Sequence, residues 1–219
     1  MGESSGRKRI QIDVVSDTVC PWCFVGRRTS TRRWSNLRTD LTLRWHPFLL
    51  SPSAPKEGIK KSEFYRQKFG NQSESINSRM KQVFQSLGYE YDLSGLWGST
   101  LDSHRLIDFA GKQGFQKQHD LVEELFLNYF TQGKYIGDRQ VLLEAAEKVG
   151  VEGAAEFLED PSQGLNEVKE ELGRYAERVN GVPHYLINGK EEFSGGRPPE
   201  AFCGLLKLLP SERAHRLEK

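Results

Sequence analysis

The sequence has few cysteines, no long hydrophobic run and almost no net charge, and each shortage excludes a class of protein. Three cysteines among 219 residues are too few for a secreted scaffold held together by several disulfides. The apolar runs are only a few residues long, far below the roughly 20 that a membrane-spanning helix needs. The 31 basic and 30 acidic side chains leave a net charge of +1, so broad electrostatic attraction predicts no nucleic-acid partner.

The N-terminal residues contain no recognisable targeting signal. Residues 1–9 (MGESSGRKR) are polar and basic, whereas a secretory signal needs an apolar segment of about 7–15 residues. We therefore expect flexible tails at 1–9 and 211–219. We also expect a cytoplasmic protein, in which free thiols stay mostly reduced.

The first fifty residues predict a strand, a helix and a second strand. Residues 10–15 (IQIDVV) are β-branched, as in a buried strand, and residues 41–45 (LTLRW) alternate between apolar and polar. Between them, residues 24–37 have helical character. Their arginine cluster, within residues 27–33, is expected to lie on a solvated helix face. The order of these elements is that of a βαβ unit.

The middle of the chain differs in kind. From about residue 62 to 180 the apolar residues recur every three or four positions, which predicts helices and almost no strand. Asp102 or Ser103 is a candidate N-cap of one helix, and Asp138 of a later one. Trp97 and Tyr91 are expected to be exposed and to mark a contact surface, such as that of a homodimer.

The end of the chain returns to strands. Residues 183–187 (PHYLI) and 191–194 (EEFS) flank an Asn-Gly pair, which predicts a hairpin because Asn-Gly suits a tight turn. A last helix is predicted over residues 200–209. The elements at the two ends of the chain are too few for separate cores, so together they predict one four-stranded sheet with an α-helical insertion.

Cys20 and Cys23 form the only closely spaced cysteine pair, in the motif Cys20-Pro21-Trp22-Cys23. The motif lies between a predicted strand and a predicted helix, where the helix dipole favours a thiolate on Cys20. Pro21 suits the first helical turn because it needs no amide hydrogen. Trp22 is expected to be a partly exposed aromatic residue beside the sulfurs. A zinc half-site is disfavoured because no second ligand pair exists, and a pair of inert thiols is the other alternative.

Residues 17–26 (DTVCPWCFVG), the flanking strands, the helical insertion and residues 181–183 (GVP) resemble the DsbA-like branch of the thioredoxin superfamily. Within that branch the chain is most similar to the FrnE-type proteins, on residues 45–52 (WHPFLLSP), 99–107 (STLDSHRLI) and 128–138 (NYFTQGKYIGD). The resemblance covers roughly residues 10–210. It implies an α/β protein with a thioredoxin fold (βαβ–ββα) at residues 10–60 and 181–210, interrupted by an all-α insertion domain at residues 61–180.

The resemblance also implies roles for single residues. Cys20 matches the nucleophilic cysteine, Cys23 the resolving cysteine and Pro183 the cis-proline that packs beside them. This proline places the backbone of Val182 where an extended substrate peptide can pair with it. His184 follows and would line the groove, with an ordinary half-buried histidine as an equal alternative.

Several polar residues stay unassigned. Relatives carry a buried acid on the first strand, where this chain has Val14 and Val15 with only Asp13 nearby, so the proton-transfer partner stays open. Asp17 either shuttles protons or ends the strand. Cys203 is expected to be a buried, inert thiol in the last helix. His104 is expected to pack where the insertion meets the sheet.

The sequence predicts a thiol–disulfide oxidoreductase that forms mixed disulfides with protein or small thiol substrates. The predicted enzyme needs no bound cofactor or metal, and glutathione is a candidate redox partner. One alternative is a glutathione-dependent transferase or isomerase of the kappa-class or hydroxychromene-carboxylate isomerase type, although those relatives have serine where Cys20 stands. The other alternative is a non-catalytic, chaperone-like binding protein. Neither nucleic acid nor a membrane is expected as a partner.

Overall fold

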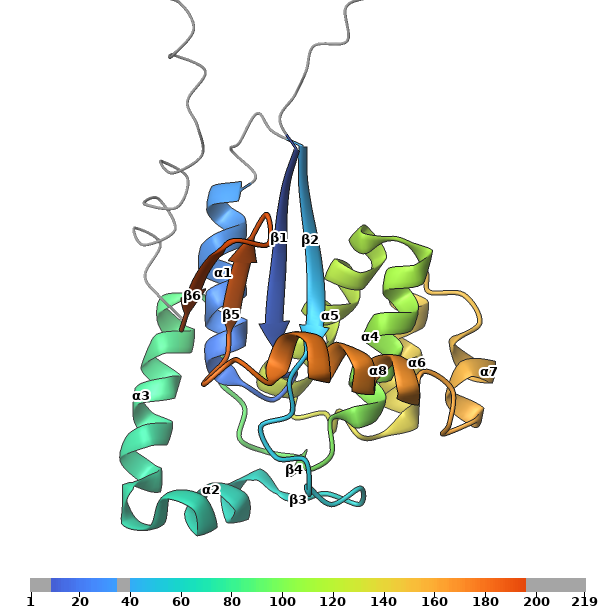
Figure 1. Cartoon of the computed structure of the whole chain (residues 1–219). Coiled ribbons are helices and arrows are strands. Elements are labelled where there is room, and N and C mark those ends of the chain that lie inside the picture. The colour runs from blue at the N-terminus through green and yellow to red at the C-terminus, as the bar shows by residue number, and fades with distance from the viewer. Residues whose placement is uncertain (1–8, 35–39, 196–219) are drawn as a thin grey trace, which may run out of the picture.

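The computed structural model describes residues 9–34 and 40–195 and has a four-stranded sheet at its centre, in the order β2-β1-β5-β6 (Figure 1). Strand β1 (Arg9–Ser16) pairs in parallel with β2 (Asp40–Pro47) and in antiparallel with β5 (His184–Ile187). Strand β5 in turn pairs in antiparallel with β6 (Glu191–Ser194). The predicted α/β fold, with both ends of the chain in one sheet, is confirmed.

Helix α1 (Pro21–Trp34) connects β1 to β2 and begins three residues earlier than periodicity predicts. Proline fits the first position of a helix because the amide hydrogen it lacks would have no partner there. Arg9 belongs to β1 and not to a tail. The predicted tails at 1–8 and 211–219, the predicted helix at 200–209 and Cys203 lie outside the described residues.

The helical insertion lies between β2 and β5 in the chain, as predicted. It contains α2 (Lys61–Phe69), α3 (Ser73–Ser86), α4 (Leu101–Gln113), α5 (Phe115–Thr131), α6 (Arg139–Lys148), α7 (Ala154–Glu159) and α8 (Leu165–Glu171). A 3-10 turn (Gly70–Gln72) joins α2 to α3, and a π-helical turn (Leu172–Ala176) extends α8. Among the described helices, none is long and apolar enough to cross a membrane.

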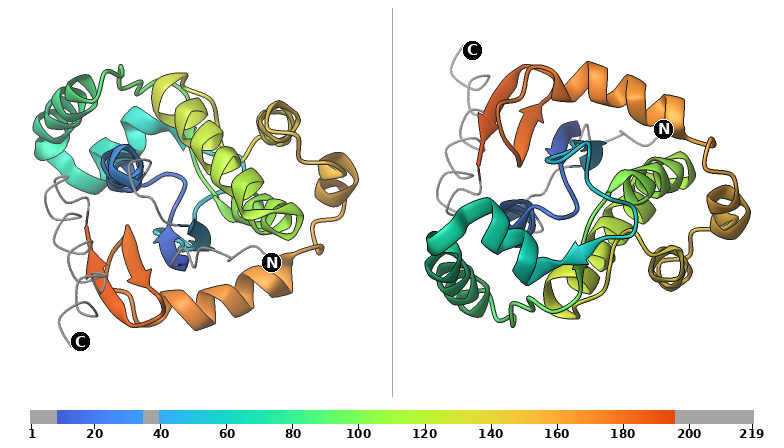
Figure 2. Two further views of the ribbon diagram at one scale, coloured as in Figure 1. Left: turned by 90° about the horizontal axis from the view of Figure 1, so that it is seen from above. Right: turned by 90° about the horizontal axis from the view of Figure 1, so that it is seen from below.

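The helices enclose the sheet from two sides. Figure 2 shows α8 along one side of β1 and β2, with α1, α4 and α5 on the opposite side. A second sheet of two short strands, β3 (Ile59–Lys60) and β4 (Leu96–Trp97), was not predicted, because two residues are too few for an alternating pattern.

The cap predictions have different outcomes. Asp138 caps α6 by accepting a hydrogen bond from the backbone N–H of Gln140 at 2.7 Å, as predicted. Helix α4 already begins at Leu101, so the prediction of a cap at Asp102 or Ser103 is wrong. The Ser103 hydroxyl lies inside the first turn and donates to the carbonyl of Thr100 at 2.7 Å.

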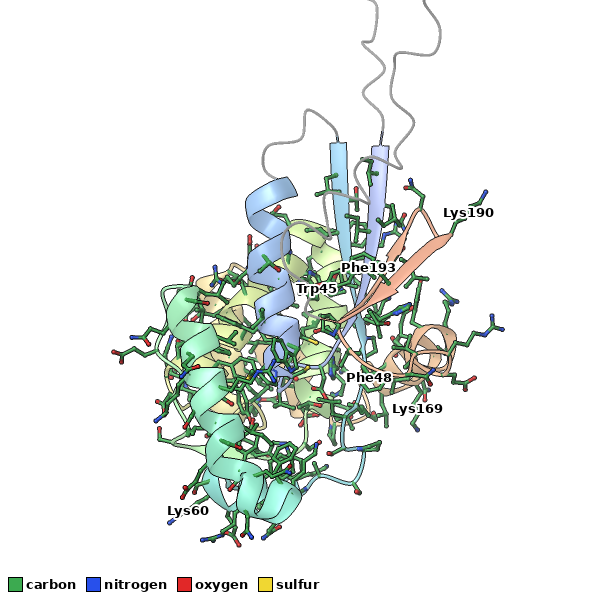
Figure 3. The ribbon with its side chains drawn as sticks, turned by 90° about the vertical axis from the view of Figure 1, so that its left-hand side faces the viewer. Trp45, Phe48, Lys60, Lys169, Lys190 and Phe193 are labelled. Atoms are coloured by element: carbon green, nitrogen blue, oxygen red, sulfur yellow. The ribbon has the colours of Figure 1, made fainter. Side chains whose placement is uncertain are left out.

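The sheet and the insertion share one hydrophobic core, and side chains fill the space between the ribbons (Figure 3). Aromatic rings connect α1 to α3 within this core. The ring of Phe24 stacks on that of Phe84 with 4.6 Å between centroids, and both are fully buried. Tyr91 packs on Phe84 at 4.7 Å, and Trp97 stacks on Phe64 at 3.7 Å. The prediction that Trp97 and Tyr91 are exposed is therefore wrong, and it no longer supports a homodimer surface.

The arginine face of α1 is not fully solvated either. Arg27 is only 6% exposed and forms an ion pair with Glu123 of α5, which also pairs with Arg28. Arg27 also lies 3.1 Å from the Nε2 atom of His119. These arginines hold α1 against the insertion, so the prediction of a solvated face is wrong for both residues.

Candidate active site

The cysteine motif lies at the start of α1, as predicted. The backbone N–H of Cys20 donates to the carbonyl of Asp17 at 3.0 Å, and the Cys20 carbonyl accepts from Cys23 at 3.0 Å. Cys20 therefore occupies the position just before α1, next to the free backbone N–H groups of its first turn. Both cysteines are free thiols, and Cys20 is 5% and Cys23 1% exposed.

The loop before β5 approaches the first sulfur directly. The Val182–Pro183 peptide bond is cis, as the resemblance implies. The Cys20 thiol donates to the Val182 carbonyl, with 3.6 Å between sulfur and oxygen. Residues 20 and 182, which are far apart in sequence, thus meet at one point of the fold.

A glycine in α1 makes this approach feasible. A Cβ atom at Gly26 would lie 2.4 Å from the Tyr185 hydroxyl oxygen and 3.1 Å from Cγ of Pro183. Any side chain here would push α1 away from the strand that carries the cis-proline. Gly26 therefore fixes the distance between the cysteine motif and the loop that faces it.

Burial sets the protonation of the second cysteine. It raises the pKa of the Cys23 thiol well above its ordinary value, and the neighbouring Cys20 sulfur raises it further. Hydrogen bonds with the Ser16 hydroxyl and the backbone of Asp17 act in the opposite direction. Cys23 therefore rests as a thiol, and it must lose a proton before it can act as a nucleophile.

An apolar cavity of about 460 Å³ opens beside Cys20, within the usual size range of ligand sites. The start of α1 and the loop before β5 form one wall. The insertion forms most of the others, through α2, α3 and β4, and the segment after β2 completes them. The cavity is lined by Val19, Cys20, Pro21, Trp22, Leu50, Ser51, Phe64, Tyr65, Lys68, Phe69, Ile76, Arg79, Met80, Trp97, Gly181 and Val182.

The structure brings together most of the predicted site residues. Pro21, Trp22 and Val182 line the same cavity as Cys20. His184 does not line it: it is buried between β5 and β6, where its Nδ1 atom lies 2.7 Å from the Ser194 hydroxyl. The interpretation of His184 as an ordinary structural histidine is therefore the better one.

Asp17 has a structural role in its loop. Its buried carboxylate accepts a hydrogen bond from the backbone N–H of Leu50 at 2.8 Å, which anchors the segment after β2 to the motif. The same carboxylate lies 3.6 Å from the Nε2 atom of His104 on α4. His104 is 4% exposed and packs between the insertion and the sheet, as predicted.

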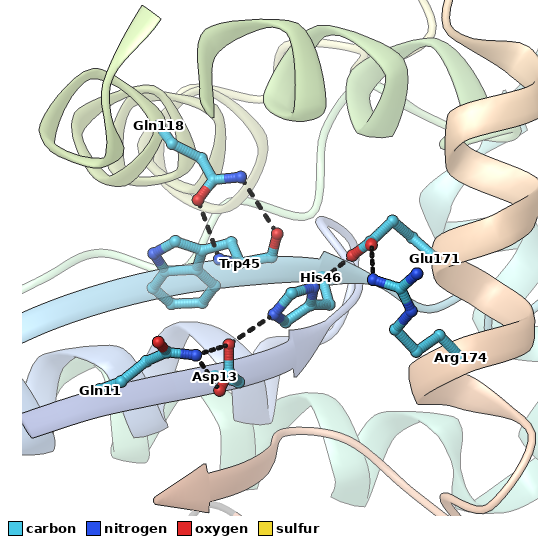
Figure 4. Close-up of polar contacts among 7 residues, drawn as sticks. All are labelled: Gln11, Asp13, Trp45, His46, Gln118, Glu171 and Arg174. Atoms are coloured by element: carbon cyan, nitrogen blue, oxygen red, sulfur yellow. Dashed lines mark hydrogen bonds and ion pairs between the residues drawn. The ribbon is translucent and has the colours of Figure 1, made fainter. Parts of the chain in front are cut away.

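A buried polar cluster ties the π-helical end of the insertion to the sheet (Figure 4). The Nε2 atom of His46 lies 2.9 Å from the Asp13 carboxylate, and its Nδ1 atom contacts Glu171. Burial alone would lower the pKa of His46, but its hydrogen bonds to Asp13 and Glu171 raise it above the ordinary value. Burial alone would raise the pKa of Asp13, but hydrogen bonds from His46 and Gln11 lower it.

Sequence reasoning missed the side chains that the insertion contributes to the cavity. Phe64, Lys68 and Phe69 come from α2, and Arg79 comes from α3. Their spacing along the chain is that of any amphipathic helix, so no local signal marks them. The structure offers no metal centre: within residues 9–34 and 40–195, no three His, Cys, Asp or Glu side chains are grouped to hold an ion.

Comparisons with known proteins agree with this geometry. The chain is 24% identical to the uncharacterized protein YwbO of Bacillus subtilis over 181 residues, which is 81% of this chain and 86% of YwbO. The probable DsbA oxidoreductase SCO1869 of Streptomyces coelicolor has the same fold, with a TM-score of 0.81 and 23% identity over 91% of this chain and 89% of that one.

Two further solved structures share the fold. The cytosolic disulfide reductase DsbM of Pseudomonas aeruginosa gives a TM-score of 0.61 at 16% identity, over 91% of this chain and 100% of DsbM. A 2-hydroxychromene-2-carboxylate isomerase also gives 0.61, at 15% identity over 90% and 93% of the two chains. The DSBA-like thioredoxin domain matches residues 11–207, which include the cysteine motif, the insertion and the cis-proline. The chain therefore belongs to the family of DSBA-like thioredoxin domains.

Proposed function

We propose that this protein is a thiol–disulfide oxidoreductase that acts through Cys20 and Cys23 on protein or small thiol substrates. The observation that supports this proposal most strongly is the position of Cys20. It lies at the start of a helix and in the wall of an apolar cavity, and its sulfur is 3.6 Å from the Val182 carbonyl oxygen. Cys23 lies next to it and deeper in the protein. This arrangement supports one exchange step at the cavity and one internal step.

The reaction consists of two thiol–disulfide exchanges. The Cys20 thiolate attacks one sulfur of a substrate disulfide, and the other substrate sulfur leaves with the electron pair of the broken bond. The Cys23 thiolate then attacks the Cys20 sulfur, forms the Cys20–Cys23 disulfide and releases the second substrate sulfur as a thiolate. Two electrons pass from the protein to the substrate, and the reverse sequence oxidises a dithiol.

The cavity supports substrates with an apolar group next to the reacting sulfur. Most of its lining is apolar, and Val182, which lines it, offers its backbone for pairing with an extended peptide. Glutathione is proposed as a redox partner, which is supported by a structure of the relative DsbM with glutathione. A cytoplasmic location is proposed for the same reason, because DsbM is described as cytosolic.

Single substitutions test the assignment. Cys20→Ser should reduce insulin disulfide reduction to the uncatalysed rate, because no thiol remains among the described residues that line the cavity. Cys23→Ser should instead accumulate mixed disulfides with substrate, visible as added mass on intact protein. Cys203→Ser is the matched control and should keep wild-type activity.

Two results would favour other functions. Activity retained in Cys20→Ser would refute the exchange mechanism. Saturable conjugation of glutathione that survives Cys20→Ser would instead support a transferase. Suppression of aggregation that is equal with both cysteines replaced would support a binding protein without catalysis.

A further inference from the structure

The Cys23 thiol must lose a proton in the second exchange, yet the strand beside it carries no free acid. Val14 and Val15 are apolar, and Asp13 is held by His46 and Gln11. The nearest polar side chain of β1 is that of Ser16, the last residue of the strand, whose hydroxyl lowers the pKa of the Cys23 thiol against the effect of burial. The route for the proton therefore begins at Ser16.

Ser16 also lines a small cavity. The polar residues around it are Ser16, Thr18, His46 and His104, and three apolar side chains close it. All of these residues are less than one-tenth exposed. The centre of a water molecule has about 10 Å³ of room there, which is enough for one water and not for two.

Two of the polar groups around the cavity have hydrogen-bonding capacity left over. The Nε2 atom of His104 has no hydrogen-bond partner within the described residues, although the residue is only 4% exposed. The Thr18 hydroxyl lies 2.9 Å from that of Ser103, which itself donates to Thr100. Thr18 therefore donates to Ser103 and keeps its own lone pairs for another donor.

We propose that one water molecule, bound between Ser16, Thr18 and His104, carries the proton of the Cys23 thiol to His104 during the second exchange. The Cys23 S–H proton passes to the Ser16 oxygen, the Ser16 proton to the water, and a water proton to the Nε2 lone pair of His104. The Cys23 sulfur keeps the electron pair and attacks Cys20. The reverse reaction returns the proton by the same route.

The surroundings of His104 fit a group that gains a proton transiently. The Asp17 carboxylate, 3.6 Å from Nε2, stabilises the imidazolium when it forms. The other titratable group at the cavity is His46 of β2, whose two nitrogens are already engaged by Asp13 and Glu171. The residues facing the cavity from α4 and α5 besides His104 are apolar. His104 is thus a positioning residue that acts through Ser16 without touching the sulfur.

This role rests on the proposed thiol–disulfide exchange, and one assay separates the two. The full chain with Cys203→Ser is reduced and mixed with dithiobis-nitrobenzoate in a stopped-flow instrument. Attack by Cys20 releases one nitrothiobenzoate anion, and resolution by Cys23 releases a second, both read by absorbance. The first phase reports the proposed function, and the second phase reports deprotonation of Cys23.

His104→Gln keeps hydrogen-bonding atoms but cannot take up the proton. It should leave the first phase unchanged and slow the second about 100-fold at pH 7, the lower end of what acid–base assistance contributes. Between about pH 6 and 9 its second phase should become proportional to hydroxide, whereas the wild type should level off. Ser16→Ala should show the same change, and the double variant should be no slower than either single one.

His119→Gln is the matched control, because His119 is also buried but does not line the cavity and instead contacts Trp45 and Arg27. It should keep the wild-type second phase and pH profile. A His104→Gln protein with an unchanged second phase, or one slowed equally at every pH, would overturn the relay. A wild-type protein without a first phase would overturn the proposed function and the relay together.

Discussion

The contact between Gly26 and the cis-proline strand gives a quantitative prediction. Gly26→Ala places a Cβ atom 2.4 Å from the Tyr185 hydroxyl oxygen, which is shorter than real Cβ contacts, and 3.1 Å from Pro183, which is tighter than most of them. Overpacking of this kind costs about 1–3 kcal/mol. In a helix interior alanine is otherwise about 1 kcal/mol more favourable than glycine, so the net change should lie between about zero and a loss of 2 kcal/mol.

Gly173→Ala supplies the matched comparison. Gly173 is also helical, but a Cβ atom there would meet only the Glu177 carboxylate, at 3.8 Å. Gly173→Ala should therefore show the propensity gain without the clash. The difference between the two variants, about 1–3 kcal/mol, isolates the contact with β5.

Urea unfolding followed by circular dichroism measures both free energies of unfolding, and the insulin assay measures activity. We expect Gly26→Ala to be less stable than Gly173→Ala and also less active, because α1 moves away from the loop that faces Cys20. If Gly26→Ala is as stable and as active as Gly173→Ala, the close approach of α1 to β5 does not exist in solution.

Two further predictions concern buried charge. The folded pKa of His46 is raised above its ordinary 6.5, so its charged form should add stability below pH 6.5, and this should be lost as the pH rises through the folded value. Thermal melts across this range should show the advantage of wild type over His46→Gln shrinking at high pH, and a constant difference would contradict the assignment. Glu123→Gln removes an ion pair from the buried guanidinium of Arg27 and should cost about 3 kcal/mol in urea unfolding. Glu144→Gln is the exposed control and should leave the midpoint nearly unchanged, and equal effects of the two would refute a buried role for Arg27.

The elements of the sheet could be predicted from the sequence because their signals are local. The β-branched run at residues 10–15, the Asn188-Gly189 turn and the proline at the start of α1 each act within a few residues. The placement of Cys20 next to Val182 has no local signal. The resemblance of residues 181–183 to a known family supplied it, and the distance of 3.6 Å supports it.

The errors share one physical cause. Tyr91, Trp97 and Arg27 were assigned to the surface from their own segments, although each is buried by a partner from another element. A tyrosine in a loop or an arginine on a polar helix face is normally exposed. Only the tertiary arrangement shows that Phe84, Phe64 and Glu123 cover these three side chains.

The cavity beside Cys20 is built from two separate stretches of the chain. One stretch carries the reacting sulfurs, and the other shapes the far walls that a bound molecule would touch. The reacting sulfurs and the loop facing them come from the sheet and α1, whereas the far walls come largely from α2 and α3. Substitutions in α2 and α3 can thus change which molecule is accepted while the electron chemistry stays constant. Variants of α2 and α3 therefore offer a way to change the substrate preference of this chain without altering Cys20 or Cys23.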